Sequence, residues 1–197
     1  MDDTKLLLSF RLQDQSRIVA EINQDLTRIR NWRFDNQSLL NPDKAKLLVC
    51  GSKLGVTKTH DSKLSFLGKQ LAPVEAARDL GVILDTSLTF DHHISATVAS
   101  CMSRLGQINR VKHCFDNCTL IIIINALVFS KLFYCSSVRS STSQSNIAKL
   151  QAVQDFDCRI ISVSKKYDHV TCILRQLNWL PVKQHMYYRD SLMAFNA

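Results

Sequence analysis

Residues that interrupt regular structure are scarce in this chain, which has five glycines and three prolines among 197 residues. Because Gly and Pro mark turns, their scarcity favours long helices over a β fold with many turns. Charged residues make up 21% of the chain, near the globular average, which argues against wholesale disorder. A hydrophobic content of 46% is enough for one full core, or for a small subdomain followed by a helical domain.

The chain also lacks any Cys-x-x-Cys pair, and its seven cysteines are odd in number. Neither a zinc finger nor a complete disulfide framework is therefore indicated. His113, Cys114 and Cys118 could begin a metal site, but no second ligand pair follows at zinc-finger spacing. We interpret the cysteines as reduced, mostly buried thiols of an intracellular protein, either cytoplasmic or nuclear.

No secretory signal and no long apolar run are present. The chain starts with the acidic pair Asp2 and Asp3, whereas a signal peptide starts with basic residues. The most apolar run, residues 120–133, is short and contains Asn125 and Lys131. It therefore predicts a buried helix, and we expect no membrane partner.

Residues 1–90 alternate short apolar runs with turn residues. The runs predict short strands at residues 5–10, 46–50, 64–67 and 80–84. An amphipathic helix is predicted from a cap at Asp14 or Ser16 to about Arg33, because apolar residues recur there at helical spacing. Residues 39–43 predict a turn, and the polar residues 53–62 predict a loop.

The rest of the chain shows only helical periodicity. Asp91 and Asp116 can each cap an amphipathic helix, and a third helix is predicted to begin near Ser143. Two shorter helices are expected near residues 169–177 and 184–195. The predicted fold class is thus α+β, with short antiparallel strands and one helix first and an all-helical part second.

The charge is unevenly divided between these parts. Residues 1–90 hold 13 Lys and Arg against 11 Asp and Glu, whereas residues 91–197 hold 12 against 6. The balance of +6 in the second part suggests a surface for a polyanion. A soluble basic protein without such a partner would have the same composition.

Asp2 and Asp3 are adjacent carboxylates that precede an apolar run. Carboxylates next to a strand need a partner, and a divalent cation is the usual one. Nucleotidyl transfer uses Mg²⁺ ions held by such aspartates. Taken alone, however, a terminal Met-Asp-Asp is more often a solvated turn.

Asp2 and Asp3 belong to the first of three short motifs that follow one another along residues 1–90. They are Met-Asp-Asp-Thr-Lys-Leu-Leu-Leu at residues 1–8, Asn-Pro-Asp-Lys-Ala-Lys at 41–46, and Leu-Gly-Val at 80–82 followed by Leu-Thr-Phe at 88–90. In order and spacing they resemble the Tyr-x-Asp-Asp turn, the Asn-x-x-Lys-Thr stretch and the Leu-Gly-Val primer grip of reverse transcriptases from non-LTR (LINE-type) retrotransposons. The resemblance extends through the helical part and covers nearly the whole chain.

The resemblance implies roles for the matching positions. Asp2 would bind the catalytic Mg²⁺, with Asp3 as its weaker neighbour. Lys44 would lie near the incoming nucleotide, where a cation can neutralise or protonate the departing pyrophosphate; a solvated turn lysine is the alternative. The hairpin beneath the primer end would be formed by Leu80, Gly81 and Val82. Gly81 would let another backbone approach closely, or would be a glycine tolerated in a core strand.

By the same resemblance, residues 1–88 would be the C-terminal part of the palm, and residues 89–197 the helical thumb and the region after it. A thumb holds the duplex of RNA template and DNA primer through backbone phosphates. The candidate phosphate-binding cations are Arg104, Arg110, Lys112, Lys131, Lys149, Arg159, Lys165 and Lys166. Each could instead belong to a solvated helix surface. Trp179, Tyr187 and Tyr188 could stack on bases, although core or interface packing is their more usual role.

Two departures from the family qualify the implied activity. Ala45 stands where the family usually has Thr. The family also places another catalytic aspartate, the nucleotide pocket and the fingers upstream of the Asp-Asp turn. We therefore expect a fragment of an RNA-directed DNA polymerase that is inactive by itself and could pair with the missing N-terminal half. The alternatives are a non-catalytic nucleic-acid-binding protein and an inert remnant.

Overall fold

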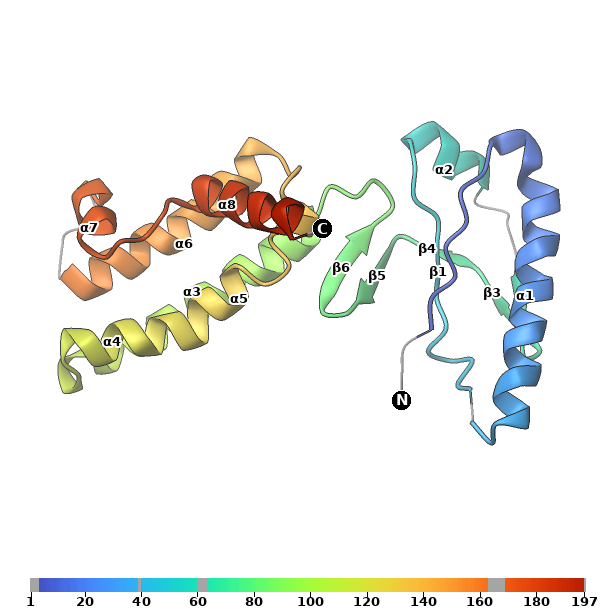
Figure 1. Cartoon of the computed structure of the whole chain (residues 1–197), viewed down its shortest axis with the longest axis horizontal. Helices are drawn as coiled ribbons and strands as arrows, with labels where there is room; N and C mark the ends of the chain where they lie inside the picture. The colour runs from blue at the N-terminus through green and yellow to red at the C-terminus, as the bar shows by residue number, and fades with distance from the viewer. Residues whose placement is uncertain (1–3, 39, 60–63, 163–168, 197) are drawn as a thin grey trace. The chain divides into compact units, whose positions relative to one another are not determined.

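The computed structural model describes residues 4–38, 40–59, 64–162 and 169–196. The chain forms two compact units, Met1–Leu88 and Thr89–Ala197, which run from blue to green and from green to red in Figure 1. The first unit combines helices with short strands, whereas the second is helical. The fold is therefore α+β.

A long helix packs against a hairpin in the first unit. The helix α1 (Gln15–Asp35) follows a 3-10 turn, η1 (Leu12–Asp14), and confirms the predicted amphipathic helix. The strands β2 (Leu64–Phe66) and β3 (Lys69–Leu71) pair antiparallel. Buried side chains of this hairpin form the core: Leu64, Phe66 and Leu71. Partly buried apolar side chains pack against them: Val19, Ile22, Leu26, Leu40, Ala45 and Leu47.

Two further strand pairs complete the first unit. The strand β1 (Leu47–Leu48) pairs in parallel with β4 (Pro73–Val74). The strand β5 (Ala76–Asp79) pairs antiparallel with β6 (Val82–Asp85). The strands predicted near 46–50, 64–67 and 80–84 are thus present, each over fewer residues than the apolar run suggested.

Both antiparallel hairpins close through a Leu-Gly pair. The φ angles are 50° and 80° at Leu67 and Gly68, and 43° and 85° at Leu80 and Gly81. Two-residue hairpin turns of type I′ have positive φ at both positions, and their twist matches the twist of the strands. Leu80 and Gly81 therefore lie in a turn, not in a strand, and it is the positive φ that explains the glycine.

Three predictions for the first unit are wrong. The strands are not all antiparallel, because β1 and β4 are joined by a connection long enough for them to run in the same direction. Residues 5–10 form no strand, because none of the described residues offers them a hydrogen-bonded edge, and Leu7 is 96% exposed. The predicted loop at 53–62 contains a helix, α2 (Lys53–Thr59). Its start is capped by Ser52, whose hydroxyl accepts a hydrogen bond from the backbone N–H of Gly55 at 3.2 Å.

Two long helices form the centre of the second unit. They are α3 (Asp91–Val111) and α6 (Gln144–Ser162), and they pack against each other. Each buries one face, as its periodicity predicted. The most deeply buried apolar side chains of the unit come from several helices: Ile94, Cys101, Leu105, Ile124, Val128, Leu132, Leu150, Val153, Cys158, Ile160 and Val182.

The helix predicted from Asp116 to Leu132 is present, but it changes pitch on the way. After the 3-10 turn η2 (Lys112–Cys114), it comprises α4 (Asn117–Ile124), the π-helical segment η3 (Asn125–Phe129) and α5 (Ser130–Leu132). Figure 1 draws it as one yellow-green rod alongside α3. Asp116 stands at its N-cap position, as predicted.

The last part of the chain returns across α6. A 3-10 turn, η4 (Ser137–Arg139), leads into α6, and the two predicted short helices appear as α7 (Thr171–Gln176) and α8 (Val182–Phe195). The helix α8 packs against α6 and η4. Among the described residues, no helix is long and apolar enough to cross a membrane.

Two predictions for the second unit are wrong. Asp91 is not the cap of α3 but its first residue; Phe90 precedes it with φ 63°. The cysteines are free, but most are not buried, since only Cys101 and Cys158 are enclosed. The others lie on outward faces or in turns, where an apolar neighbour in sequence is not a neighbour in space.

Candidate nucleic-acid interface

Four of the predicted site residues lie outside the described residues. They are Asp2, Asp3, Lys165 and Lys166. Within the part of the chain that the structure describes, no group of three or more His, Cys, Asp or Glu residues could hold a metal ion. The role of Asp2 and Asp3 toward Mg²⁺ stays a prediction.

Lys44 lies exposed at the end of a turn. Its backbone N–H donates to the carbonyl of Asn41 at 3.3 Å, and the Asn41 side chain accepts from the N–H of Asp43 at 2.9 Å. The neighbouring Asp43 pairs with Lys69 at 2.8 Å, and this hydrogen bond lowers the pKa of Asp43. The turn is thus anchored to β3, with the Lys44 side chain at its surface.

Leu80, Gly81 and Val82 lie at the tip of the β5–β6 hairpin. Leu80 is 62% exposed, whereas Val82 is 5% exposed. The hairpin is also held at its base, because the N–H of Thr86 donates to the carbonyl of Glu75 at 3.2 Å. The structure places Leu80 and Gly81 in the turn and Val82 at the start of β6; their role at a primer end is a prediction.

Two of the predicted phosphate-binding cations, Arg104 and Lys131, lie together between α3 and the α4–α5 rod. The guanidinium of Arg104 donates to the carbonyl of Leu127 at 2.6 Å, and the amine of Lys131 donates to the hydroxyl of Ser100 at 2.5 Å. Both act on the thiol of Cys101 between them: burial raises its pKa most, while Lys131 and Arg104 lower it. These two cations therefore help to join α3 to the rod.

The other predicted cations do not form one cluster with this pair. Arg110 is exposed in the last turn of α3, and Lys112 begins η2. Lys149 is exposed on α6 and donates to the side chain of Asn146 at 3.2 Å. Arg159 is half-buried further along α6, where its Nε is enclosed without a hydrogen-bond partner.

Ion pairs are distributed unequally between the units. Within the described residues, the pairs within 4.0 Å all belong to the first unit: Lys5–Asp79, Arg17–Asp14, Arg28–Asp25 and Lys69–Asp43. None of the described Lys and Arg side chains of the helical unit has such a carboxylate neighbour. The charge of these side chains is thus not neutralised by a close carboxylate.

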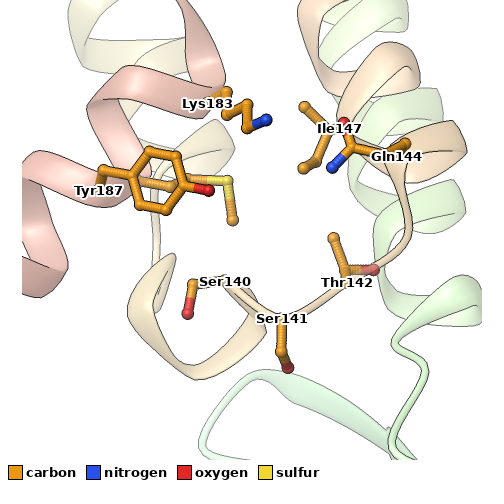
Figure 2. Close-up of a pocket in the computed structure, with 8 residues that line it drawn as sticks. Ser140, Ser141, Thr142, Gln144, Ile147, Lys183 and Tyr187 are labelled. Carbon is orange, nitrogen blue, oxygen red and sulfur yellow. The ribbon is translucent and has the colours of Figure 1, made fainter.

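A pocket of about 240 Å³ in the helical unit was missed by sequence reasoning. Its walls come from the turn before α6, the start of α6 and the first turns of α8 (Figure 2). The lining residues are Ser140, Ser141, Thr142, Gln144, Ile147, Lys183, Met186 and Tyr187. The run of Ser and Thr at residues 140–143 was a signal for it, since such residues gather before helix starts.

Two buried ionisable groups were also missed. Arg139 is 1% exposed; its Nη2 donates to the carbonyl of Leu132, while its Nε and Nη1 have no partner. Asp157 is fully buried, with neither oxygen hydrogen-bonded, and burial raises its pKa to about 8. A polar residue on the buried face of an amphipathic helix was the signal, because Asp157 follows the core residue Val153 by four positions.

No protein-family model, curated protein or solved structure matches the chain.

Proposed function

We propose that the chain binds nucleic acid through the cations of its helical unit, as the C-terminal palm and thumb of a non-LTR retrotransposon reverse transcriptase. The partner would be the duplex of RNA template and DNA primer. In the intact enzyme Asp2 and Asp3 would bind Mg²⁺, and Lys44 would lie near the departing pyrophosphate.

The observation that carries the proposal is the uncompensated charge of the helical unit. Residues 91–197 hold 12 Lys and Arg against 6 Asp and Glu. None of the described cations there is paired with a carboxylate, and Asp157 carries little charge at neutral pH because its pKa is raised to about 8. Surface cations without carboxylate partners are free to replace the counterions of a phosphate backbone.

The reverse-transcriptase part of the proposal is supported by the order of motifs and by the place of one of them. Leu80, Gly81 and Val82 match the family's primer-grip segment, which is a hairpin, and they lie at the turn of β5–β6. The order of a mixed unit followed by a helical unit agrees with a palm followed by a thumb. A gene-level test is available, because an open reading frame upstream of Met1 should encode a Tyr and then an earlier aspartate motif.

A salt titration tests the binding. The full chain is titrated with labelled RNA–DNA and DNA duplexes, and affinity should fall linearly on a log–log plot as salt rises. Duplexes of scrambled sequence should bind alike, because phosphate contacts carry no sequence information. The double variant Arg110→Gln/Lys149→Gln should reduce the salt slope by roughly 1 to 2, at about 0.9 for each lost phosphate contact.

A matched pair of exposed lysines in the first unit provides the control. The double variant Lys46→Gln/Lys58→Gln removes the same charge and should leave both affinity and slope nearly unchanged. Binding that is indifferent to salt, or that falls equally in both double variants, would contradict the proposal and favour the inert-remnant alternative.

A further inference from the structure

The pocket beside the start of α8 has walls that are held in place by buried and partly buried hydrogen bonds. Thr142 donates to the carbonyl of Thr89 at 3.0 Å and accepts from the side chain of Asn146 at 2.9 Å. On the other side, Gln151 accepts from the backbone N–H of Val182 at 2.9 Å. Gln154, also on α6, donates to the carbonyl of Leu180 at 3.0 Å. The opening is therefore shaped before any ligand arrives.

The polar ends of three side chains point into the pocket. Figure 2 shows the amine of Lys183, the side-chain amide of Gln144 and the hydroxyl of Tyr187 directed toward the central space. The hydroxyls of Ser140 and Thr142 are already used, since Ser140 donates to the carbonyl of Ser137 at 3.0 Å and Thr142 is bonded as above. The groups available to a ligand are therefore mainly hydrogen-bond donors around one cation.

The electrostatics of the pocket select an anion. None of the eight described residues that line it is Asp or Glu, and one is Lys. The helices α6 and α8 both begin near its rim, where the positive ends of their dipoles add to the charge of Lys183. A phosphate is the anion that such an arrangement of amine, amide and helix starts suits best.

An aromatic ring adjoins this anion site. The side chain of Tyr187 is 61% exposed, and the amine of Lys183 lies 5.9 Å from its ring centroid. An exposed ring of this kind can stack on any base, because every base has a π face. The cavity of about 240 Å³ is smaller than the roughly 300–1,000 Å³ that drug-sized ligands occupy, so it can hold only part of a nucleotide and no duplex.

We infer that this pocket binds the phosphate of one unpaired nucleotide of a nucleic-acid strand against Lys183 and Gln144, while the base of that nucleotide stacks on the exposed ring of Tyr187 at the rim. The inference rests on the proposed function, to which it adds a site for a single-stranded extension of the bound duplex. It predicts that the chain prefers a duplex with an overhang to a blunt duplex.

The test compares two labelled duplexes of equal base-paired length, one blunt and one with a four-nucleotide overhang. The full chain should bind the overhang duplex at least about fivefold more tightly, which corresponds to one stacked base. Lys183→Gln and Tyr187→Leu should each remove most of that preference. For the blunt duplex, Lys183→Gln should lower the affinity no more than the loss of another cation of the same unit does. Tyr187→Phe keeps the ring and should retain most of the preference.

Two matched controls lie close by. Tyr188→Leu removes an aromatic residue of α8 that is 53% exposed and does not line the pocket, and Arg175→Gln removes a cation of the same unit. Neither should change the preference for an overhang. A nucleoside monophosphate in excess should abolish the preference, whereas inorganic phosphate at equal concentration should weaken it less because it cannot stack.

The outcomes separate this inference from the function on which it rests. Salt-dependent binding with no difference between blunt and overhang duplexes would overturn the pocket and leave the proposed function standing. Absence of salt-dependent binding to either duplex would overturn both. A preference for the overhang that survives Lys183→Gln and Tyr187→Leu would place the single strand elsewhere and also overturn the inference.

Discussion

At the scale of single residues, Asp157 is a buried carboxyl group whose oxygens have no hydrogen-bond partner. It lies on the buried face of α6, fully enclosed, and burial raises its pKa from 3.8 to about 8. Between these two pH values the folded chain keeps a proton that the unfolded chain has lost. The stability associated with that proton is complete below pH 3.8 and is lost as pH rises toward about 8.

The variant Asp157→Asn should therefore stabilise the helical unit at neutral pH. The expected gain at pH 7 is roughly 2–4 kcal/mol, since each pH unit of difference is worth about 1.4 kcal/mol and the amide still lacks a partner. The gain should shrink as pH falls toward 3.8 and vanish below that value, where the carboxyl is protonated in both states. Urea unfolding at several pH values measures it, with Trp179 fluorescence as the reporter in a Trp32→Phe background.

Asp155 provides the control for this measurement. It lies on the same helix, half-buried, and accepts a hydrogen bond from Gln151 at 2.9 Å. Asp155→Asn should leave the pH dependence of stability between pH 4 and 8 in place. If Asp157→Asn has the same small effect, the folded protein stabilises the Asp157 carboxylate, and the predicted dependence of stability on its protonation is wrong.

At the scale of elements, the β5–β6 turn has a leucine at a position where φ is positive. Leu80 has φ 43°, a region that costs most residues about 1–2 kcal/mol and that Asn tolerates. Leu80→Asn should therefore raise the free energy of unfolding of the first unit by about 1 kcal/mol. Gly81→Ala should lower it, because φ is 85° there. Thermal unfolding followed by circular dichroism would measure both.

An exposed leucine in ordinary helical backbone controls for the loss of apolar surface. Leu54 is 69% exposed within α2, so Leu54→Asn removes a comparable side chain without relieving a positive φ. It should give no gain in stability. Equal gains at Leu54 and Leu80 would show that exposure, and not backbone strain, determines the effect.

A buried amide hydrogen-bonds α6 to the start of α3. The Nδ2 of Asn146, which is fully buried, donates to Asp91 at 2.5 Å and to Thr142 at 2.9 Å. Asn146→Ala should cost the helical unit about 2–3 kcal/mol, since it removes these two hydrogen bonds and the one from Lys149, and leaves a buried hydroxyl with fewer partners. Urea unfolding would measure the loss. Asn109→Ala, at an exposed position of α3, should cost far less.

At the scale of the whole molecule, the two units differ in charge as well as in structure. The first unit pairs several of its cations with carboxylates, whereas the described cations of the helical unit are not so paired. We therefore expect a fragment comprising residues 89–197 to retain most of the affinity for duplex and most of its salt dependence. Circular dichroism must show that the fragment is helical before its binding is compared with that of the full chain.

The complementary fragment completes this comparison. Residues 1–88 carry a nearly balanced charge and should bind duplex weakly at physiological salt. Duplex binding confined to that fragment would contradict the assignment of the interface to the helical unit.

Much of the helical unit could be predicted from the sequence, because a helix is made by local contacts with a fixed period. The pattern of apolar residues placed α1, α3 and α6 close to their observed limits, and the chain's few glycines and prolines left these helices uninterrupted. The difference in charge between the two parts is likewise a property of the sequence.

Strand pairing, burial and the pocket were decided only by the tertiary structure. Residues 5–10 have the composition of a strand but no edge to pair with among the described residues, and most cysteines lie outside the core. Lys183 is far in sequence from Gln144, and only the packing of α8 on α6 brings them to one pocket. The physical reason is that pairing, burial and convergence depend on contacts between distant residues, which local periodicity does not encode.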